Sequence, residues 1–194
     1  MRHLSLTNIV LLNGAGSVGK SAIAKAFQKI APQPYLHIEM DVFLKMMPEK
    51  YLNHRDGLSF EQYSKAGHIL TKANSGKVAE KVLSGMRTSI AALADAGNNL
   101  IVDDVLFGNT EDGDGTAFSE YQNLLRDHDL CVVGVFASLD TLEERERARG
   151  DRMVGLSRWQ FERVHVGMPY NLKVRSDDAT PEQCAERILE IQTR

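Results

Sequence analysis

One segment of this sequence constrains the fold more than any other. Residues 14–21 read Gly-Ala-Gly-Ser-Val-Gly-Lys-Ser, which is the spacing of a phosphate-binding loop. The apolar run Asn8–Asn13 comes directly before it and is typical of a buried strand, and the amphipathic segment Lys20–Ile30 follows as a helix. A strand, a glycine-rich turn and a helix in this order begin an α/β fold with a parallel sheet.

The residue types of this loop are those that phosphate binding requires. Gly14 and Gly19 permit backbone angles that wrap the chain around an anion. Lys20 is expected to reach the β- and γ-phosphates, and the Ser21 hydroxyl is expected to ligate Mg²⁺. A glycine-rich turn without a ligand is the alternative, but the position between strand and helix favours ATP binding. The expected nucleotide contacts are Gly14, Ala15, Gly16, Ser17, Val18, Gly19, Lys20 and Ser21.

Strands and helices alternate along the rest of the chain, which predicts a parallel sheet with helices on both faces. After the first strand, further strands are expected at residues 35–39, 100–102, 130–136 and 172–174. A short helix or turn is expected at residues 43–48. Helices are expected at residues 60–96 with a break near Gly76, 118–127, 139–149, 157–166 and from Pro181 onward. Residues 49–57 and 108–116 are predicted to be loops. The prediction is one kinase domain over residues 1–194 with a five-stranded parallel sheet.

Composition narrows the class of protein. The chain has 194 residues, 43% apolar content and a net charge of −3 without a basic stretch, so nucleic-acid binding is not expected. No apolar run approaches the roughly 20 residues that a membrane span needs, and no signal-peptide pattern is present. Two separate cysteines, Cys131 and Cys184, indicate neither a disulfide framework nor a metal cluster. We expect a cytoplasmic protein, and its oligomeric state stays open.

Carboxylates follow two of the predicted strands, where ligands of open α/β sheets bind. Asp103 comes directly after Leu-Ile-Val, the position from which a P-loop enzyme holds Mg²⁺ or its waters. Asp104 is adjacent, and its side chain should point in a different direction. A turn-capping role for one of the two is the alternative, and we favour Asp103 as the metal residue.

Asp41 follows the second strand and is a candidate catalytic base. A carboxylate there can accept the proton of an acceptor hydroxyl and orient its oxygen for attack. Glu39 is a competitor for this role. A structural alternative is that Asp41 caps a helix that starts near Val42.

Four arginines lie in and just after the predicted helix at 139–149. Arg145, Arg149 and Arg152 are spaced by four and three residues, so they share one face if the helix continues past Gly150. We expect a lid at about residues 143–156 that closes over the triphosphate, with Arg149 stabilising transition-state charge. Arg147 points elsewhere and can pair with Glu143. A solvated charged helix, with Glu146 paired to Arg149, is the alternative.

With these elements placed, the chain resembles the chloramphenicol phosphotransferase family, which is related to the shikimate and nucleotide kinases. The resemblance lies in residues 9–21, 100–108, 145–152 and 165–170 and in Asp41. It implies ATP as donor and Asp41 as the base that deprotonates the acceptor hydroxyl. In the antibiotic-modifying member the acceptor is a primary hydroxyl of chloramphenicol. Residues 45–77 and 109–117 match least, so the resemblance leaves the acceptor open.

The leading hypothesis is a kinase of a small alcohol with a role in antibiotic resistance, and two other functions compete with it. A kinase of a nucleoside, sugar or nucleotide-sugar metabolite, including toxin-type kinases, fits the same loop and carboxylates. A non-catalytic nucleotide switch is disfavoured because the chain has no Asn-Lys-x-Asp motif. The acceptor pocket is expected to have an apolar wall formed by Val42, Phe43, Met46, Met47, Val105, Leu106 and Phe107. The histidines, His37 and His165 among them, show no ligand spacing and are interpreted as packing or surface residues.

Overall fold

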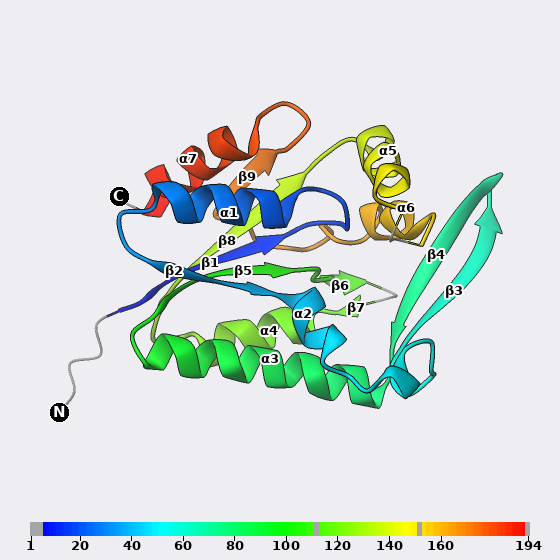
Figure 1. The fold of residues 1–194 in the computed structure, drawn as a ribbon, viewed down its shortest axis with the longest axis horizontal. Helices are drawn as coiled ribbons and strands as arrows, with labels where there is room; N and C mark the ends of the chain where they lie inside the picture. The colour runs from blue at the N-terminus through cyan, green and yellow to red at the C-terminus, as the bar shows by residue number, and fades with distance from the viewer. Residues whose placement is uncertain (1–5, 111–112, 151–152, 193–194) are drawn as a thin grey trace.

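A parallel sheet of five strands forms the centre of the protein in the computed structural model, which describes residues 6–110, 113–150 and 153–192 (Figure 1). The strand order is β2-β5-β1-β8-β9. The strands are β1 (Asn8–Asn13), β2 (Tyr35–Glu39), β5 (Asn99–Asp104), β8 (Asp129–Phe136) and β9 (Leu172–Arg175). The five strand predictions are confirmed, and so is the α/β fold class.

Helices cover both faces of this sheet (Figure 1). On one face, α1 (Lys20–Ile30) and α7 (Pro181–Gln192) pack on side chains such as Val10 and Val133. On the other face, α3 (Lys77–Asp95) and α4 (Thr116–Leu124) pack on side chains such as Leu11 and Val102. Because successive residues of a strand point to opposite faces, a strand buried on both faces must be apolar throughout. That is why β1 reads as a continuous apolar run.

The remaining helices lie near the ends of the strands. Helix α2 (Met40–Lys45) continues directly from β2, and α5 (Leu139–Arg149) follows β8. Helix α6 (Leu156–Phe161) packs beside α5 and is shorter than the predicted helix at 157–166. The predicted helix at 43–48 is found three residues earlier in the chain.

The prediction of helix from residue 60 is wrong for its first part. Residues 58–75 form an antiparallel hairpin of β3 (Leu58–Lys65) and β4 (His68–Ser75), and α3 begins only at Lys77. Ala66 and Gly67 have φ angles of 51° and 79°, as a two-residue turn of the I′ type requires. The hairpin extends from the body of the protein (Figure 1) and packs on the start of α6, where the Thr71 N–H donates to the Gly155 carbonyl at 3.1 Å.

Two predicted loops contain short regular elements. The 49–57 loop includes a 3-10 turn, η1 (Glu49–Tyr51), and the 108–116 loop includes the two-residue strands β6 (Asn109–Thr110) and β7 (Gly113–Asp114). Over the described ranges, no helix is both long and apolar enough to cross a membrane.

Candidate active site

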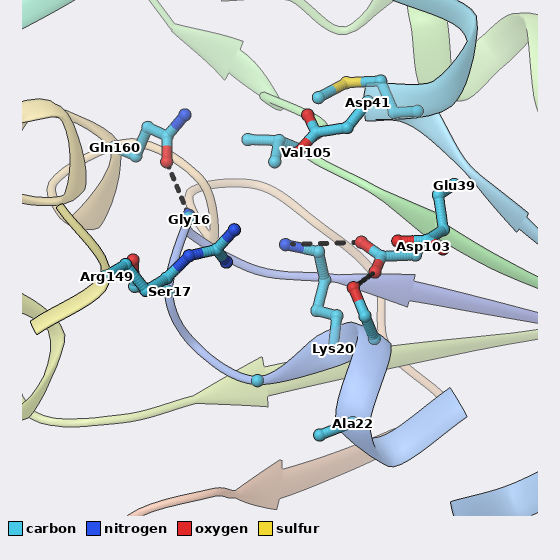
Figure 2. A pocket seen from close by; sticks show the side chains of 13 residues that line it. Gly16, Ser17, Lys20, Ala22, Glu39, Asp41, Asp103, Val105, Arg149 and Gln160 are labelled. Atoms are coloured by element: carbon cyan, nitrogen blue, oxygen red, sulfur yellow. Dashed lines mark hydrogen bonds and ion pairs between the residues drawn. The ribbon is translucent and has the colours of Figure 1, made fainter. Parts of the chain in front are cut away.

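The phosphate-binding loop connects β1 to α1 and lines a cavity of about 210 Å³ (Figure 2). The loop approaches β8 so closely that a Cβ atom on Gly14 would lie 2.5 Å from the Val135 carbonyl oxygen, which excludes any other residue there. Gly19 has a φ of 96° and Ser17 a φ of 63°, so the chain turns sharply before α1 begins. The turn brings the first N–H groups of α1 to the cavity, where a helix N-terminus attracts anions.

Lys20 lies at the floor of this cavity and is 6% exposed. Its Nζ donates to the carbonyl oxygens of Gly14 and Ala15 at 2.8 and 3.1 Å. The same ammonium group lies 3.7 Å from Oδ1 of Asp103. Lys20 is therefore a buried cation whose charge is available to the cavity that the loop encloses.

Ser21 and Asp103 meet at the end of β5. The Ser21 hydroxyl donates to Oδ2 of Asp103 at 2.5 Å (Figure 2). Glu39, at the end of the neighbouring strand β2, lines the same cavity. A hydroxyl and two carboxylates are the hard oxygen ligands that Mg²⁺ takes together with water and phosphate oxygens. The donor set therefore fits the magnesium ion expected at Ser21 and Asp103, with Glu39 added to it.

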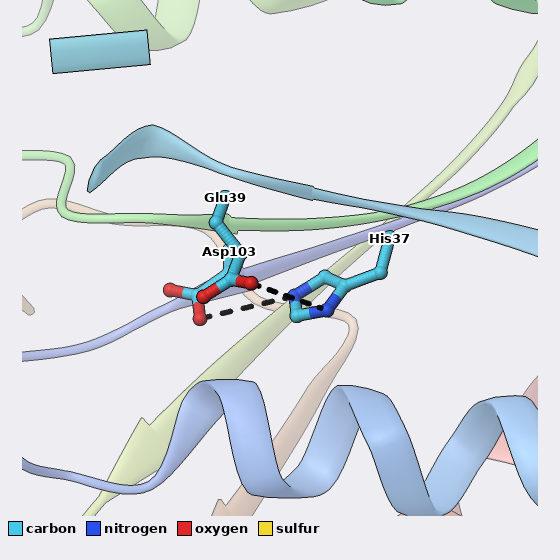
Figure 3. Close-up of side chains that lie close together, drawn as sticks. All are labelled: His37, Glu39 and Asp103. Carbon is cyan, nitrogen blue, oxygen red and sulfur yellow. Dashed lines mark ion pairs between the residues drawn. The ribbon is translucent and has the colours of Figure 1, made fainter. Parts of the chain in front are cut away.

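His37 lies behind these carboxylates (Figure 3). Its Nε2 is 4.0 Å from Oδ2 of Asp103 and its Nδ1 is 3.8 Å from Oε1 of Glu39. Burial lowers the pKa of His37 from its ordinary value, although both carboxylates act in the opposite direction. The three side chains come close enough to offer ligand atoms to one metal ion. The interpretation of His37 as an ordinary packing residue missed this position beside the carboxylates.

Asp104 points to the opposite side of β5 from Asp103, as successive strand residues do. It is buried, and its two oxygens accept hydrogen bonds from the Val105 N–H at 2.7 Å and the Tyr121 hydroxyl at 2.9 Å. Burial raises the pKa of Asp104. Asp104 is thus directed to helix α4, and Asp103 is the member of the pair that faces Lys20 and Ser21.

Asp41 lies in the first turn of α2 and lines the cavity of the phosphate loop. Helix α2 starts at Met40 with Glu39 in the N-cap position, so the alternative that Asp41 caps a helix from Val42 is wrong. Asp41 also lines a second, outer cavity of about 380 Å³ between α2, the residues that follow η1, and the hairpin. It therefore lies between the phosphate loop and space that an acceptor can enter.

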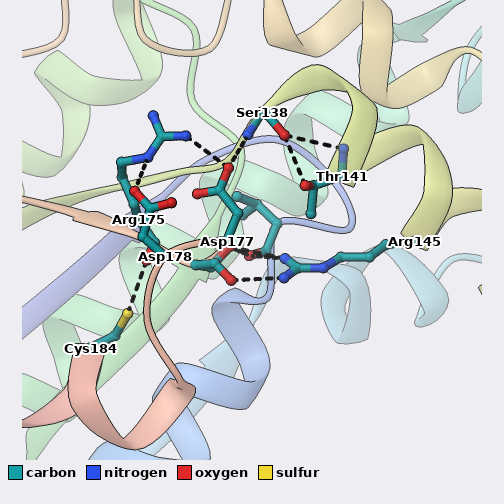
Figure 4. Close-up of polar contacts among 9 residues, drawn as sticks. Ser138, Thr141, Arg145, Arg175, Asp177, Asp178 and Cys184 are labelled. Atoms are coloured by element: carbon teal, nitrogen blue, oxygen red, sulfur yellow. Dashed lines mark hydrogen bonds and ion pairs between the residues drawn. The ribbon is translucent and has the colours of Figure 1, made fainter.

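The arginines of α5 take different positions. Helix α5 ends at Arg149, and Gly150 has a φ of 67°, so the helix does not continue to align Arg152; Arg152 lies outside the described residues. Arg149 lines both the phosphate cavity and the outer cavity. Arg145 instead donates to the Ser176 carbonyl at 2.8 Å and to the Val18 carbonyl at 3.3 Å, which ties β9 to the loop from behind (Figure 4).

The pairings expected for the acidic residues of α5 are different in the structure. Glu146 is buried and accepts hydrogen bonds from the N–H groups of Gly155 and Ser157, both at 2.7 Å, so it fixes the start of α6. Arg147 donates to the Glu143 carbonyl at 3.2 Å, whereas the Glu143 carboxylate pairs with Arg158 at 2.6 Å. The alternative of a solvated charged helix therefore describes α5 incompletely, because Glu143 and Glu146 bind residues in and next to α6.

Gln160 of α6 was missed by the sequence patterns, because nothing in its local sequence distinguishes it from a helix residue. Its Oε1 accepts a hydrogen bond from the Gly16 N–H at 2.6 Å (Figure 2). The Ser157 hydroxyl donates to the Gly16 carbonyl at 3.2 Å. Helix α6 thus holds both polar groups of one residue in the loop. Gln160 also lines an inner cavity of about 230 Å³ that adjoins the phosphate cavity at Met40 and Val105.

The apolar wall predicted around Asp41 is correct for one segment and wrong for the other. Val105, Leu106 and Phe107 line the inner cavity together with Met40 and Leu44 of α2. The other predicted residues of this region lie elsewhere: Val42 and Met46 are 48% and 64% exposed, Met47 is buried in a separate cluster, and Phe43 packs toward α3 and α4. The helix predicted at residues 43–48 begins at Met40 instead, so the prediction assigned the wrong residues to the side of α2 that faces the cavity.

The sheet, the loop and the strand-end carboxylates define the P-loop kinase fold. This chain belongs to the chloramphenicol phosphotransferase-like family, whose model matches residues 7–193. A relative from Mycobacterium tuberculosis, provisionally named an O-phosphotransferase, is 28% identical over 178 residues, which are 89% of this chain and 76% of that protein. Family membership places the chain among the small-molecule kinases.

Three solved kinase structures have a similar fold. The APS kinase of Mycobacterium tuberculosis has a TM-score of 0.65 and 14% identity, over 97% of this chain and 99% of that one. A sugar kinase from a Janibacter species has a TM-score of 0.59 and 18% identity, over 95% and 93% of the two chains. A gluconokinase from Sinorhizobium meliloti has a TM-score of 0.57 and 16% identity, over 96% and 95%. At these identities the likeness describes the fold.

Proposed function

We propose that this chain transfers the γ-phosphoryl group of ATP to a hydroxyl of a small molecule, with chloramphenicol as the first candidate acceptor. The observation that carries the proposal is that Lys20, Asp103, Asp41 and Arg149 line one cavity. Family membership supports the transfer chemistry, and the AMPPNP bound in the similarly folded APS kinase supports a nucleoside triphosphate as donor.

On the donor side, the loop N–H groups and Lys20 bind the β- and γ-phosphates and neutralise charge that develops during transfer. Ser21, Asp103 and Glu39 would hold Mg²⁺, which supplies further positive charge to the phosphate oxygens when bound. Arg149 enters the cavity from the opposite side and is the candidate for stabilising charge on the transferred group. The proposal includes a lid over residues 143–156 that closes over the triphosphate, with Gly150 at the end of α5 as its hinge.

On the acceptor side, Asp41 is the proposed general base. It accepts the hydroxyl proton as the oxygen attacks the γ-phosphorus and the bond to the β-phosphate oxygen breaks, so ADP leaves and a phosphate monoester forms. Asp41 lines the outer cavity, and the inner cavity adjoins the phosphate cavity that Asp41 also lines. Apolar side chains such as Leu44 and Leu58 line both the inner and the outer cavity. Pockets of this kind suit an acceptor with an apolar body and few polar groups.

The decisive experiment is phosphoryl transfer from Mg-ATP, followed by mass spectrometry. Chloramphenicol is incubated beside an analogue that lacks the primary hydroxyl, and a panel of sugars and nucleosides is incubated in parallel. A phosphoryl mass gain on the drug but not on the analogue supports the full proposal. A gain only on a sugar or nucleoside would retain the kinase and reject chloramphenicol. Acceptor-independent release of ADP as the sole reaction would reject the phosphotransferase.

A further inference from the structure

The inner cavity contains a buried charge that the proposed transfer does not use. Arg87 of α3 lines this cavity, and its side chain is 10% exposed. Burying a guanidinium group is costly unless its hydrogen-bond donors are satisfied. Arg87 lines the inner cavity but not the phosphate cavity, so its guanidinium group needs a structural partner or a ligand in the inner cavity.

Glu120 is the structural partner of Arg87, and it accepts a hydrogen bond from only one of the guanidinium nitrogens. The Arg87 Nε donates to Oε2 of Glu120 at 2.5 Å, and the other oxygen of Glu120 accepts from the Ser84 hydroxyl at 2.7 Å. The ring of Tyr121 lies 6.0 Å from the Arg87 Cζ and supports its flat face. An arginine has five N–H donors, so the Nη groups remain available after the Nε bond is made. Glu120 thus orients the guanidinium group but leaves its Nη hydrogen-bond donors available to a ligand.

The charges around the cavity select the kind of ligand. Glu120 offsets the charge of Arg87, and the buried carboxyl of Asp104 lines the same cavity with its two oxygens already bonded. The lining therefore has hydrogen-bond donors from Arg87 but no excess of positive charge. An anionic ligand at Arg87 would be opposed by the neighbouring carboxylate of Glu120, whereas a neutral group with acceptor oxygens would not.

The cavity also has a direct path to the reacting atoms. Met40, Val105 and Gln160 line both the inner cavity and the phosphate cavity that contains Asp41. Between these residues and Arg87 the walls are apolar, with Leu83, Leu106 and Phe107 among them. A molecule whose hydroxyl lies at Asp41 can thus extend an apolar body toward Arg87.

We propose that Arg87 is a specificity residue that donates hydrogen bonds to a neutral, planar, oxygen-bearing group at the far end of the acceptor, such as a nitro group. This inference rests on the proposed function and names the acceptor class within it. A guanidinium group matches two oxygens on one planar centre by its geometry. A carboxylate and a nitro group have the same planar shape with two oxygens, so only their charge distinguishes them as ligands of Arg87.

The test uses three compounds that share the chloramphenicol scaffold and carry a nitro group, a hydrogen atom or a carboxylate at the same ring position. Binding to the full chain is measured by titration calorimetry with Mg-AMPPNP present. A hydrogen bond to a charged group gives roughly a 10- to 100-fold preference, so the nitro compound should bind the natural protein at least about 10-fold more tightly than the hydrogen compound. The carboxylate should bind more weakly than the nitro compound.

Arg87→Met should abolish the preference for nitro over hydrogen, and Arg126→Met, at a side chain 78% exposed, should keep it. Arg87→Lys retains the charge near Glu120 and provides a second variant if Arg87→Met does not fold. Its preference should be reduced, because an ammonium group cannot match two oxygens as a fork does.

Several results would overturn the inference. These are equal binding of the nitro and hydrogen compounds to the natural protein, tighter binding of the carboxylate, an unchanged preference in a folded Arg87 variant, or no binding of any compound. Phosphoryl transfer to each compound is measured separately by mass spectrometry. Arg87-dependent binding without transfer would reject the proposed function alone, and transfer without an Arg87-dependent preference would reject this inference alone.

Discussion

The Oε1 atom of Gln160 accepts a hydrogen bond from the Gly16 N–H at 2.6 Å, so a residue of α6 holds the phosphate-binding loop from a distance of 144 positions in the chain. The contact is buried, and the Ser157 hydroxyl holds the carbonyl of the same glycine. The shape of the loop is therefore set partly by α6 and not only by its own glycines.

We expect Gln160→Ala to lower the free energy of unfolding by about 1–3 kcal/mol, because a buried N–H group loses its partner. Chemical denaturation of the variant and of Gln122→Ala, an exposed glutamine of α4, provides the comparison. Equal stability of the two variants would contradict a structural role for the Gly16 contact.

Lys20→Ala should reduce phosphoryl transfer by at least roughly 10²-fold, because the charge of Lys20 at the cavity floor is lost where negative charge develops. Lys25→Ala, on the exposed side of the same helix, should leave the rate near that of the natural protein. Rates are measured as ADP release in the presence of acceptor, and circular dichroism verifies the fold. A Lys20 variant with the natural rate would refute the assignment of the loop.

Asp41→Asn keeps the shape of the side chain but removes its ability to accept a proton. We expect kcat to fall by roughly 10²–10⁴-fold, while the dissociation constant for ATP hardly changes. Asp140→Asn serves as the control, since Asp140 is also in the first turn of a helix but is exposed and outside the cavities. A variant at Asp41 that loses only stability would show a structural role instead.

Arg149 and Arg147 provide a matched pair on one helix. Arg149 lines the phosphate cavity, whereas Arg147 is exposed and contacts the Glu143 carbonyl. Arg149→Ala should reduce kcat by roughly 10³-fold, the value of an arginine that stabilises transferred charge, and Arg147→Ala should have little effect. Small and equal effects on kcat at both positions would argue that neither arginine reaches the transferred group.

The stability of the protein should fall in mild acid because of His165. Burial, followed by the charges of Lys20 and Lys173, lowers the pKa of His165 from 6.5 to about 4. Between these two values the unfolded chain binds a proton at His165 and the folded chain does not, so stability is full above pH 6.5 and decreases as the pH falls toward 4.

His165→Phe removes this titration and keeps a ring against Phe136, with which His165 is stacked at 3.7 Å. The difference in melting temperature between pH 7 and pH 5 should therefore be smaller in the variant than in the natural protein. His68→Phe, at an exposed position of the hairpin, should retain the natural difference. An unchanged pH dependence in His165→Phe would contradict the assignment.

Features that depend on neighbouring residues in the chain were predictable from the sequence. The loop from Gly14 to Ser21 and the acidic residues after two of the strands follow from local rules, because parallel strands bring their carboxyl ends to one edge. The opposite directions of Asp103 and Asp104 follow from strand periodicity in the same way. The contacts of Gln160, His37 and Arg87 were not predictable, since each depends on how distant helices and strands pack.

The hairpin was missed for a different reason. Phe60 and Tyr63 are three residues apart, which is a helical spacing, and the turn is Ala-Gly where Asn-Gly would have been a strong signal. The hairpin is also only partly covered by the rest of the protein, so its strands lack the regular alternation of a half-buried sheet.

The contact between the hairpin and α6 has a consequence for the order of substrate binding. The N–H of Thr71 and its hydroxyl bond the carbonyls of Gly155 and Val154 at 3.1 and 2.6 Å, and a Cβ atom on Gly155 would meet the Ile69 carbonyl at 2.5 Å. Val154 and Gly155 therefore cannot shift without carrying the hairpin, which lines both the inner and the outer cavity. Binding of one substrate should consequently tighten binding of the other. In double-reciprocal plots of the initial rate, the lines should intersect above the axis, because the KM for each substrate at saturation of the other is then lower than its dissociation constant from the free protein.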